Sequence, residues 1–127
     1  MKIAVVIVRT LMGALFIFGS VAYFADLFPK PELTGDMKTF NEGMAASGYL
    51  LNLVKATELV VGVLFLSGRF VPFAAILISP VIVNIFFVHV FLDRATLPVA
   101  IFLVLGNSFI GYYYRKTFAP LFKSKSE

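Results

Sequence analysis

YLLNLVKATELVVGVLFLSGRFVPFAAILISPVIVNIFFVHVFL, residues 49–92, is the segment that indicates the fold class most clearly. It holds two apolar runs of about twenty residues each, the length that a helix needs to cross a hydrocarbon layer about 30 Å thick. Only the triplet Ser67-Gly68-Arg69 stands between them, and so short a connection requires antiparallel neighbours. The stretch therefore predicts two membrane-spanning helices, over residues 49–68 and 70–92.

Two further apolar runs flank this pair, over residues 3–25 and 96–114. The first has the charged start and apolar stretch of a secretory signal peptide, but Arg9 interrupts the apolar run, so we expect a retained span. The four spans together predict an all-α protein. We expect an antiparallel bundle of four transmembrane helices that forms one domain over residues 1–127.

The composition excludes several classes of protein. Of the 127 residues, 60% are hydrophobic and 14% are charged, and the mean hydropathy is +0.94, more apolar than a soluble domain of this size. The absence of cysteine excludes disulfides, thiolate metal sites and dithiol chemistry, and a single histidine excludes a multi-histidine metal site. The net charge of +4 comes from residues scattered along membrane boundaries, so we expect no nucleic acid partner.

The basic residues also predict the orientation in the membrane. The loop over residues 26–48 holds two basic and four acidic residues, whereas six basic residues are assigned to the opposite surface: Lys2, Arg69, Arg115, Lys116, Lys123 and Lys125. Basic loops stay in the cytoplasm. We therefore expect both termini in the cytoplasm, with residues 115–127 as a basic tail that is mobile at its end.

The same loop contains a short helical pattern. Met37, Phe40 and Met44 recur at helical spacing, opposite Lys38 and Glu42. This pattern predicts an amphipathic helix too short to span the membrane. Two placements remain open: a helix in the interface or over the mouth of the bundle, and an ordinary solvated loop helix.

Polar residues within the spans are the candidates for a functional role, because a charge in hydrocarbon costs about 2.5–3.5 kcal/mol. They are Arg9, Lys55, Glu58 and His89, together with the amides Asn84 and Asn107. A helix rises about 1.5 Å per residue, which places Arg9, Glu58 and Asn107 in one layer and Lys55 and Asn84 in a deeper one. We expect Arg9 and Glu58 to form a buried pair. Such a network either binds a ligand or only holds the bundle together.

Pro80 marks the place where a cavity is expected. It removes one backbone hydrogen bond and predicts a bend just below Asn84. We expect Lys55, Glu58 and Asn84 to bind a ligand there, with Pro80, Arg9, Asn107 and His89 in support, and we expect no metal. His89 lies about 140° around the helix from Asn84, which predicts that one face cannot present both, and we expect it to be an interfacial hydrogen-bonding residue.

Three segments resemble a known family. They closely resemble the DoxX family, and they are Lys55-Ala-Thr-Glu58 to Pro72, Ser79-Pro80 to Asp93, and Arg9-Thr-Leu-Met-Gly13 to Gly19. The resemblance covers nearly the whole chain. It implies a four-helix protein of the bacterial inner membrane. Some relatives are associated with quinone-linked sulfur oxidation or with membrane complexes of redox enzymes.

Two functional hypotheses follow. The first is an accessory subunit that binds a quinone or a similar apolar ligand, or docks a redox or sulfur-metabolism partner. It would be a membrane subunit of an oxidoreductase rather than a self-contained enzyme. The second is a non-enzymatic transporter-like or assembly protein, whose buried charges line a substrate path or specify packing. The expected partners are the lipid bilayer and either a redox protein or further copies of the chain, and no catalytic residue is assigned.

Overall fold

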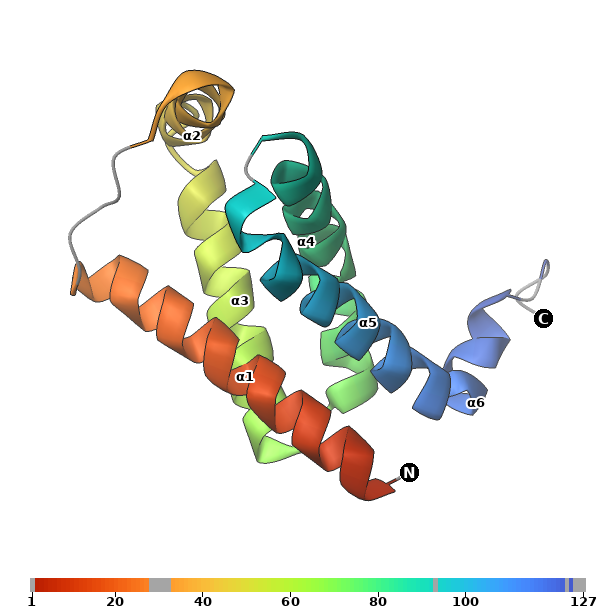
Figure 1. Ribbon diagram of the computed structural model, residues 1–127. Coiled ribbons are helices and arrows are strands. Elements are labelled where there is room, and N and C mark those ends of the chain that lie inside the picture. The colour runs from red at the N-terminus through yellow and green to blue at the C-terminus, as the bar shows by residue number, and fades with distance from the viewer. Residues whose placement is uncertain (1, 28–32, 93, 123, 125–127) are drawn as a thin grey trace.

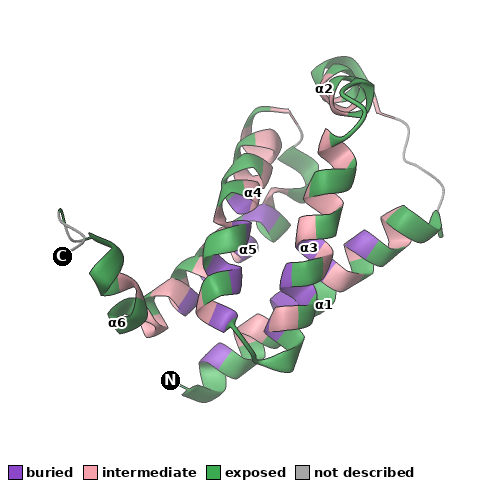
Figure 2. Ribbon diagram, turned by 180° about the vertical axis from the view of Figure 1, so that it is seen from behind, coloured by how far each residue is buried: buried purple, intermediate pink, exposed green. Residues whose placement is uncertain are grey.

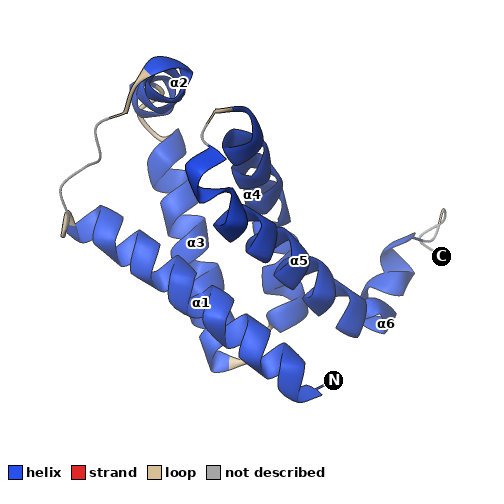
Figure 3. Cartoon of the chain, in the orientation of Figure 1, coloured by secondary structure: helices blue, strands red, loops and turns tan. Residues whose placement is uncertain are grey.

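Four long helices form the body of the protein. The structure, a computed structural model, describes residues 2–27, 33–92, 94–122 and 124. The long helices are α1 (Lys2–Ala25), α3 (Leu50–Ser67), α4 (Val71–Phe91) and α5 (Leu97–Tyr113) (Figure 1). Each is long and apolar enough to cross a membrane, α5 together with the turn before it as the span Arg94–Tyr113, and the described part of the chain contains no strand (Figure 3). The four predicted spans are thus confirmed to within a residue or two at each end.

The helices pack through a narrow core. Met12 and Phe16 of α1 meet Val61 and Phe65 of α3 in one buried cluster, which continues into α4 and α5 through residues such as Ile78. The outward faces carry large apolar side chains that remain exposed: Phe73 is 58% exposed and Leu105 64%. Figure 2 shows exposed residues along the outside of every long helix. In a membrane these faces contact lipid.

Short connections with special backbone geometry join the spans. Gly68 ends α3 in the left-handed region at φ 74°, a conformation that glycine adopts without strain. Phe70 follows at φ 56°, and Pro72 stands in the first turn of α4, where its missing N–H costs nothing. A short 3₁₀ turn, η1 (Arg94–Thr96), leads into α5. These tight turns make consecutive spans antiparallel, as predicted.

The predicted amphipathic helix is α2 (Gly35–Ala46). Met37, Phe40 and Met44 are half-buried, whereas Lys38 and Glu42 are exposed and form an ion pair of 4.0 Å. The helix lies across one end of the bundle (Figure 1). The sequence left two placements open for this helix. In the structure it lies over the mouth of the bundle.

The opposite end of the bundle gathers the N-terminus, the α3–α4 turn and two short helical segments, α6 (Arg115–Phe118) and η2 (Ala119–Phe122) (Figure 1). Both ends of the four-span body thus lie on one side. The predicted basic tail begins with these segments, and its residues 123 and 125–127 lie outside the described part of the chain.

Candidate functional site

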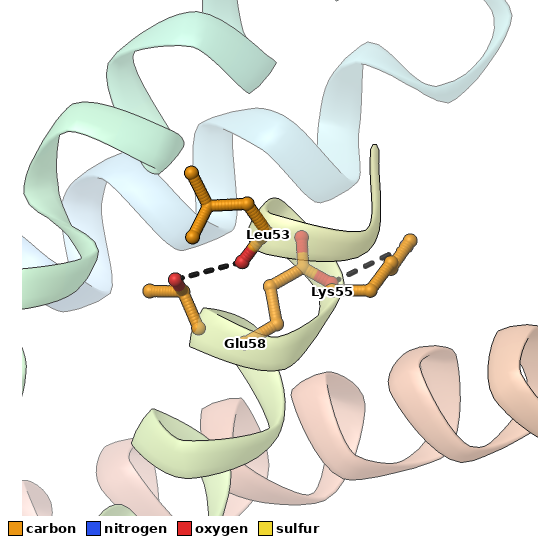
Figure 4. Close-up of polar contacts among 4 residues, drawn as sticks. Leu53, Lys55 and Glu58 are labelled. Carbon is orange, nitrogen blue, oxygen red and sulfur yellow. Dashed lines mark hydrogen bonds and ion pairs between the residues drawn. The ribbon is translucent and has the colours of Figure 1, made fainter. Parts of the chain in front are cut away.

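Helix α3 supplies a buried ion pair. Lys55 and Glu58 stand three residues apart, one helical turn, and the ammonium nitrogen of Lys55 lies 3.3 Å from Oε2 of Glu58 (Figure 4). Glu58 is only 6% exposed, and the Lys55 side chain is 26% exposed. Glu58 therefore has its countercharge on its own helix, at the edge of the bundle interior.

A cavity of about 480 Å³ adjoins this pair, between α3 and α4 and beneath α2. Its polar lining comes from Lys55, Glu58, Asn84 and His89. The apolar lining includes Met37, Phe40 and Met44 of α2, Val54 of α3, and Ile85 and Val88 of α4. A volume of about 300–1,000 Å³ with mostly apolar walls and a few polar groups is typical of small-molecule sites. The predicted site residues Lys55, Glu58 and Asn84 are thus brought together in one place.

Pro80 lines the same cavity. It lies within α4 and has no N–H, so the carbonyl of Ile76 lacks its helical donor. Pro80 and Asn84 are both exposed, although they line the cavity. They therefore stand where the cavity opens at the side of the bundle, toward the place that lipid occupies.

His89 and Asn84 both line the cavity, although they lie about 140° apart around α4. Val88 and Ile85, which also line it, lie between them around the helix. Nδ1 of His89 lies 2.8 Å from Oγ1 of Thr96, which links α4 to the residue before α5.

Arg9 corrects the predicted pair with Glu58. Its guanidinium donates to the carbonyl oxygen of Phe65 and, over 3.5 Å, to that of Leu66, at the C-terminal end of α3. The last carbonyls of a helix lack intrahelical donors and carry partial negative charge, so a cation is well placed there. Arg9 thus neutralises a helix end rather than a carboxylate.

The error lay in treating Arg9, about 9 Å from the cytoplasmic end of its span, and Glu58, about 15 Å from that end, as members of one layer. Helices α1 and α3 are antiparallel and touch at Gly13 and Gly62. Arg9 lies four residues before Gly13, and Leu66 lies four residues after Gly62. Because the two helices run in opposite directions, Arg9 therefore lies beside Leu66. Glu58, four residues before Gly62, lies on the other side of that contact along α3.

Asn107 also has partners other than those predicted. Its Nδ2 donates to the carbonyl of Ala75 over 3.3 Å and to Oγ of Ser79 over 3.0 Å, so it joins α5 to α4. The predicted cluster of Arg9, Glu58 and Asn107 is therefore wrong. The second predicted layer is correct in that Lys55 and Asn84 line one cavity.

The α2 side chains are the part of the site that the sequence left undecided. Their amphipathic spacing indicated a buried face, but did not identify what that face covers. The described residues hold no group of three or more His, Asp or Glu side chains suited to a metal ion. The polar atoms of the cavity lining include hydrogen-bond donors and acceptors from Lys55, Glu58 and Asn84.

Comparison with known proteins identifies the family. The model of the DoxX family matches residues 4–90, which include α2, α3 and nearly all of α1 and α4. The cavity-lining residues all fall inside this range. No curated protein matches the chain, and no solved structure does.

Proposed function

The chain belongs to the DoxX family, and we propose that it is an accessory membrane subunit that binds a quinone-like apolar ligand in the cavity between α3 and α4. The observation that carries this proposal is the chemistry of the cavity walls. One ammonium, one carboxylate and one amide, from Lys55, Glu58 and Asn84, line a space whose other walls are mainly apolar. A ligand with a carbonyl-bearing head and an apolar body fits this distribution.

Each polar residue has a distinct role in the proposed complex. Lys55 donates a hydrogen bond to a head-group oxygen, because its ammonium carries three donors and the contact with Glu58 uses only one. Asn84 supplies a second donor or acceptor, which orients the head. Glu58 holds Lys55 in place and is positioned to accept a proton.

The ligand enters from the bilayer in this proposal. Pro80 and Asn84 stand at the lateral opening, and apolar ligands partition into lipid before they reach a protein site. Electron transfer belongs to a partner oxidoreductase, since this chain contributes binding and hydrogen bonding. We further propose the bacterial inner membrane as its location, with both termini in the cytoplasm.

Organic extraction of the purified protein tests the proposal. Protein isolated in native lipid discs is expected to carry a quinone or a related carbonyl lipid above the level of the surrounding bilayer. The Lys55→Met/Glu58→Gln variant removes both charges and leaves neither unpaired, and it is expected to lose this enrichment. The control is Lys38→Met, which makes the same lysine change at an exposed position on α2.

The quinone content of the two proteins and of empty discs can also contradict the proposal. Equal quinone content in the wild type, in the double variant and in empty discs would overturn the binding proposal. If a partner protein is then lost from the double variant but not from Lys38→Met, the buried charges serve docking or assembly, which is the second functional hypothesis.

A further inference from the structure

A second cavity, of about 730 Å³, lies at the opposite end of the bundle, and none of its lining residues is shared with the first. Helices α4 and α5 form its floor with small side chains: Ala75, Ser79, Ser108 and Gly111. A Cβ atom built on Gly111 would meet nothing within 4 Å, so this surface of α5 is open. We call this space the α4–α5 groove.

The outer wall of the groove is apolar and exposed. Phe118, Leu121 and Phe122 from α6 and η2 line it, and Leu121 is 68% exposed and Phe122 85%. These segments project away from the four long helices (Figures 1 and 2). Aromatic and aliphatic side chains so exposed at the end of a membrane helix are suited to the acyl region of a bilayer.

A fixed cation stands at the mouth of the groove. Arg115 lines it, donates to the carbonyl of Tyr112 over 3.0 Å, and holds its guanidinium carbon 4.5 Å from the centroid of the Tyr112 ring. A guanidinium carries five N–H donors, so these contacts leave donors for an anion. The residue next to it, Lys116, is also basic.

No carboxylate competes for this cation in the elements that form the groove. The sequence has no acidic residue between Glu58 and Asp93, nor between Asp93 and Glu127. The charge of the groove is therefore purely positive, and it is confined to the end where α5 leaves the membrane.

We propose that the α4–α5 groove binds an anionic phospholipid, with the phosphate at Arg115 and an acyl chain along the small side chains of α4 and α5. Asn107 and Ser79, already bonded to each other, also line this groove, with Asn107 about 9 Å before the end of α5 at Tyr113. Basic pockets between transmembrane helices bind anionic head groups in this way. The lipid would hold the basic end of the bundle in the leaflet that it faces.

Thermal unfolding of delipidated protein in detergent tests this proposal. Titration with phosphatidylglycerol is expected to raise the Tm of the wild type, and phosphatidylcholine at the same concentrations is not. Arg115→Gln is expected to need about tenfold more phosphatidylglycerol for half of the Tm shift, the effect of losing a hydrogen bond to a charged group. Arg69→Gln is the matched control, because it removes an exposed arginine at the same end but outside the groove.

Two more variants make the outcome decisive. Gly111→Leu fills the floor of the groove and is expected to abolish the phosphatidylglycerol shift, whereas Lys55→Met, in the other cavity, keeps it. Equal shifts with both lipids, or an Arg115→Gln curve that matches the wild type, would overturn the proposal. A Gly111→Leu protein that changes oligomeric state but not lipid response would assign the groove to a second copy of the chain.

Discussion

Gly13 of α1 and Gly62 of α3 lie so close together that a Cβ atom built on either would stand 3.0 Å from the carbonyl oxygen of the other. Membrane helices pack tightly where small residues let their backbones approach. This contact sets the register of α1 against α3. It places Arg9 at the C-terminal end of α3. Glu58 instead pairs with Lys55 on its own helix.

The close contact at Gly62 predicts that adding a single methyl group there lowers the stability of the protein. Gly62→Ala should lower stability by about 1–3 kcal/mol, because the added carbon meets the Gly13 carbonyl and the side chain of Ile17. Gly19→Ala is the control on α1, since an added Cβ there meets nothing within 4 Å. Thermal unfolding in detergent measures both. Equal Tm values for the two variants would show that the helices do not touch at Gly62.

The position of Arg9 predicts an absence of coupling. In a double-mutant cycle, Arg9→Gln and Glu58→Gln should add within about 0.5 kcal/mol, because the two side chains share no partner. Lys55→Met and Glu58→Gln should instead couple by about 0.5–3 kcal/mol, as contacting charges do. Denaturant unfolding of the six proteins supplies the energies. A strong Arg9–Glu58 coupling would restore the pair that the sequence suggested.

The absence of native cysteine allows a clean test of topology. Single cysteines at Lys38 and at Lys116, both exposed and at opposite ends of the bundle, should react with a membrane-impermeant thiol reagent from opposite sides. The positive-inside rule predicts that Lys116→Cys is protected in intact cells and Lys38→Cys is labelled. Labelling of both from outside would contradict the arrangement of spans.

The link between α4 and α5 gives a further prediction. Asn107→Leu removes the donor to Ser79 and Ala75 and should cost about 1 kcal/mol, a usual value for a side-chain hydrogen bond between membrane helices. Ser108→Ala, next to it but without a bond to α4 in the described structure, should cost less. Thermal unfolding of both variants measures the difference, and equal losses would remove the role given to Asn107.

The sequence predicts the helices well, because apolar length and turn residues act locally. The span over residues 49–68 is predicted by its apolar composition and its final glycine, Gly68, and the structure ends α3 at Ser67, one residue before that glycine. The sequence also identifies the cavity residues Lys55, Glu58 and Asn84, because polar side chains in a span are unfavourable in contact with lipid and usually face the protein interior.

The pairing of polar side chains was harder to predict, because it depends on which helices touch and at what point. Depth alone placed Arg9 beside Glu58. The antiparallel contact at Gly13 and Gly62 moves these two residues apart, and no local pattern specifies that contact. Asn107 shows the same limit, since its partner Ser79 becomes visible only when α4 and α5 are placed side by side.

Photoaffinity labelling tests whether a carbonyl-bearing apolar ligand binds between α3 and α4. A short-chain quinone with a photoreactive group should label peptides of α2 and α4 that line the cavity, near Met44 and Val88. An excess of unlabelled quinone should prevent this, and the Lys55→Met/Glu58→Gln variant should reduce it severalfold relative to Lys38→Met. Labelling spread over the lipid-facing sides of α1 and α5, unaffected by competitor or by the variant, would contradict the account.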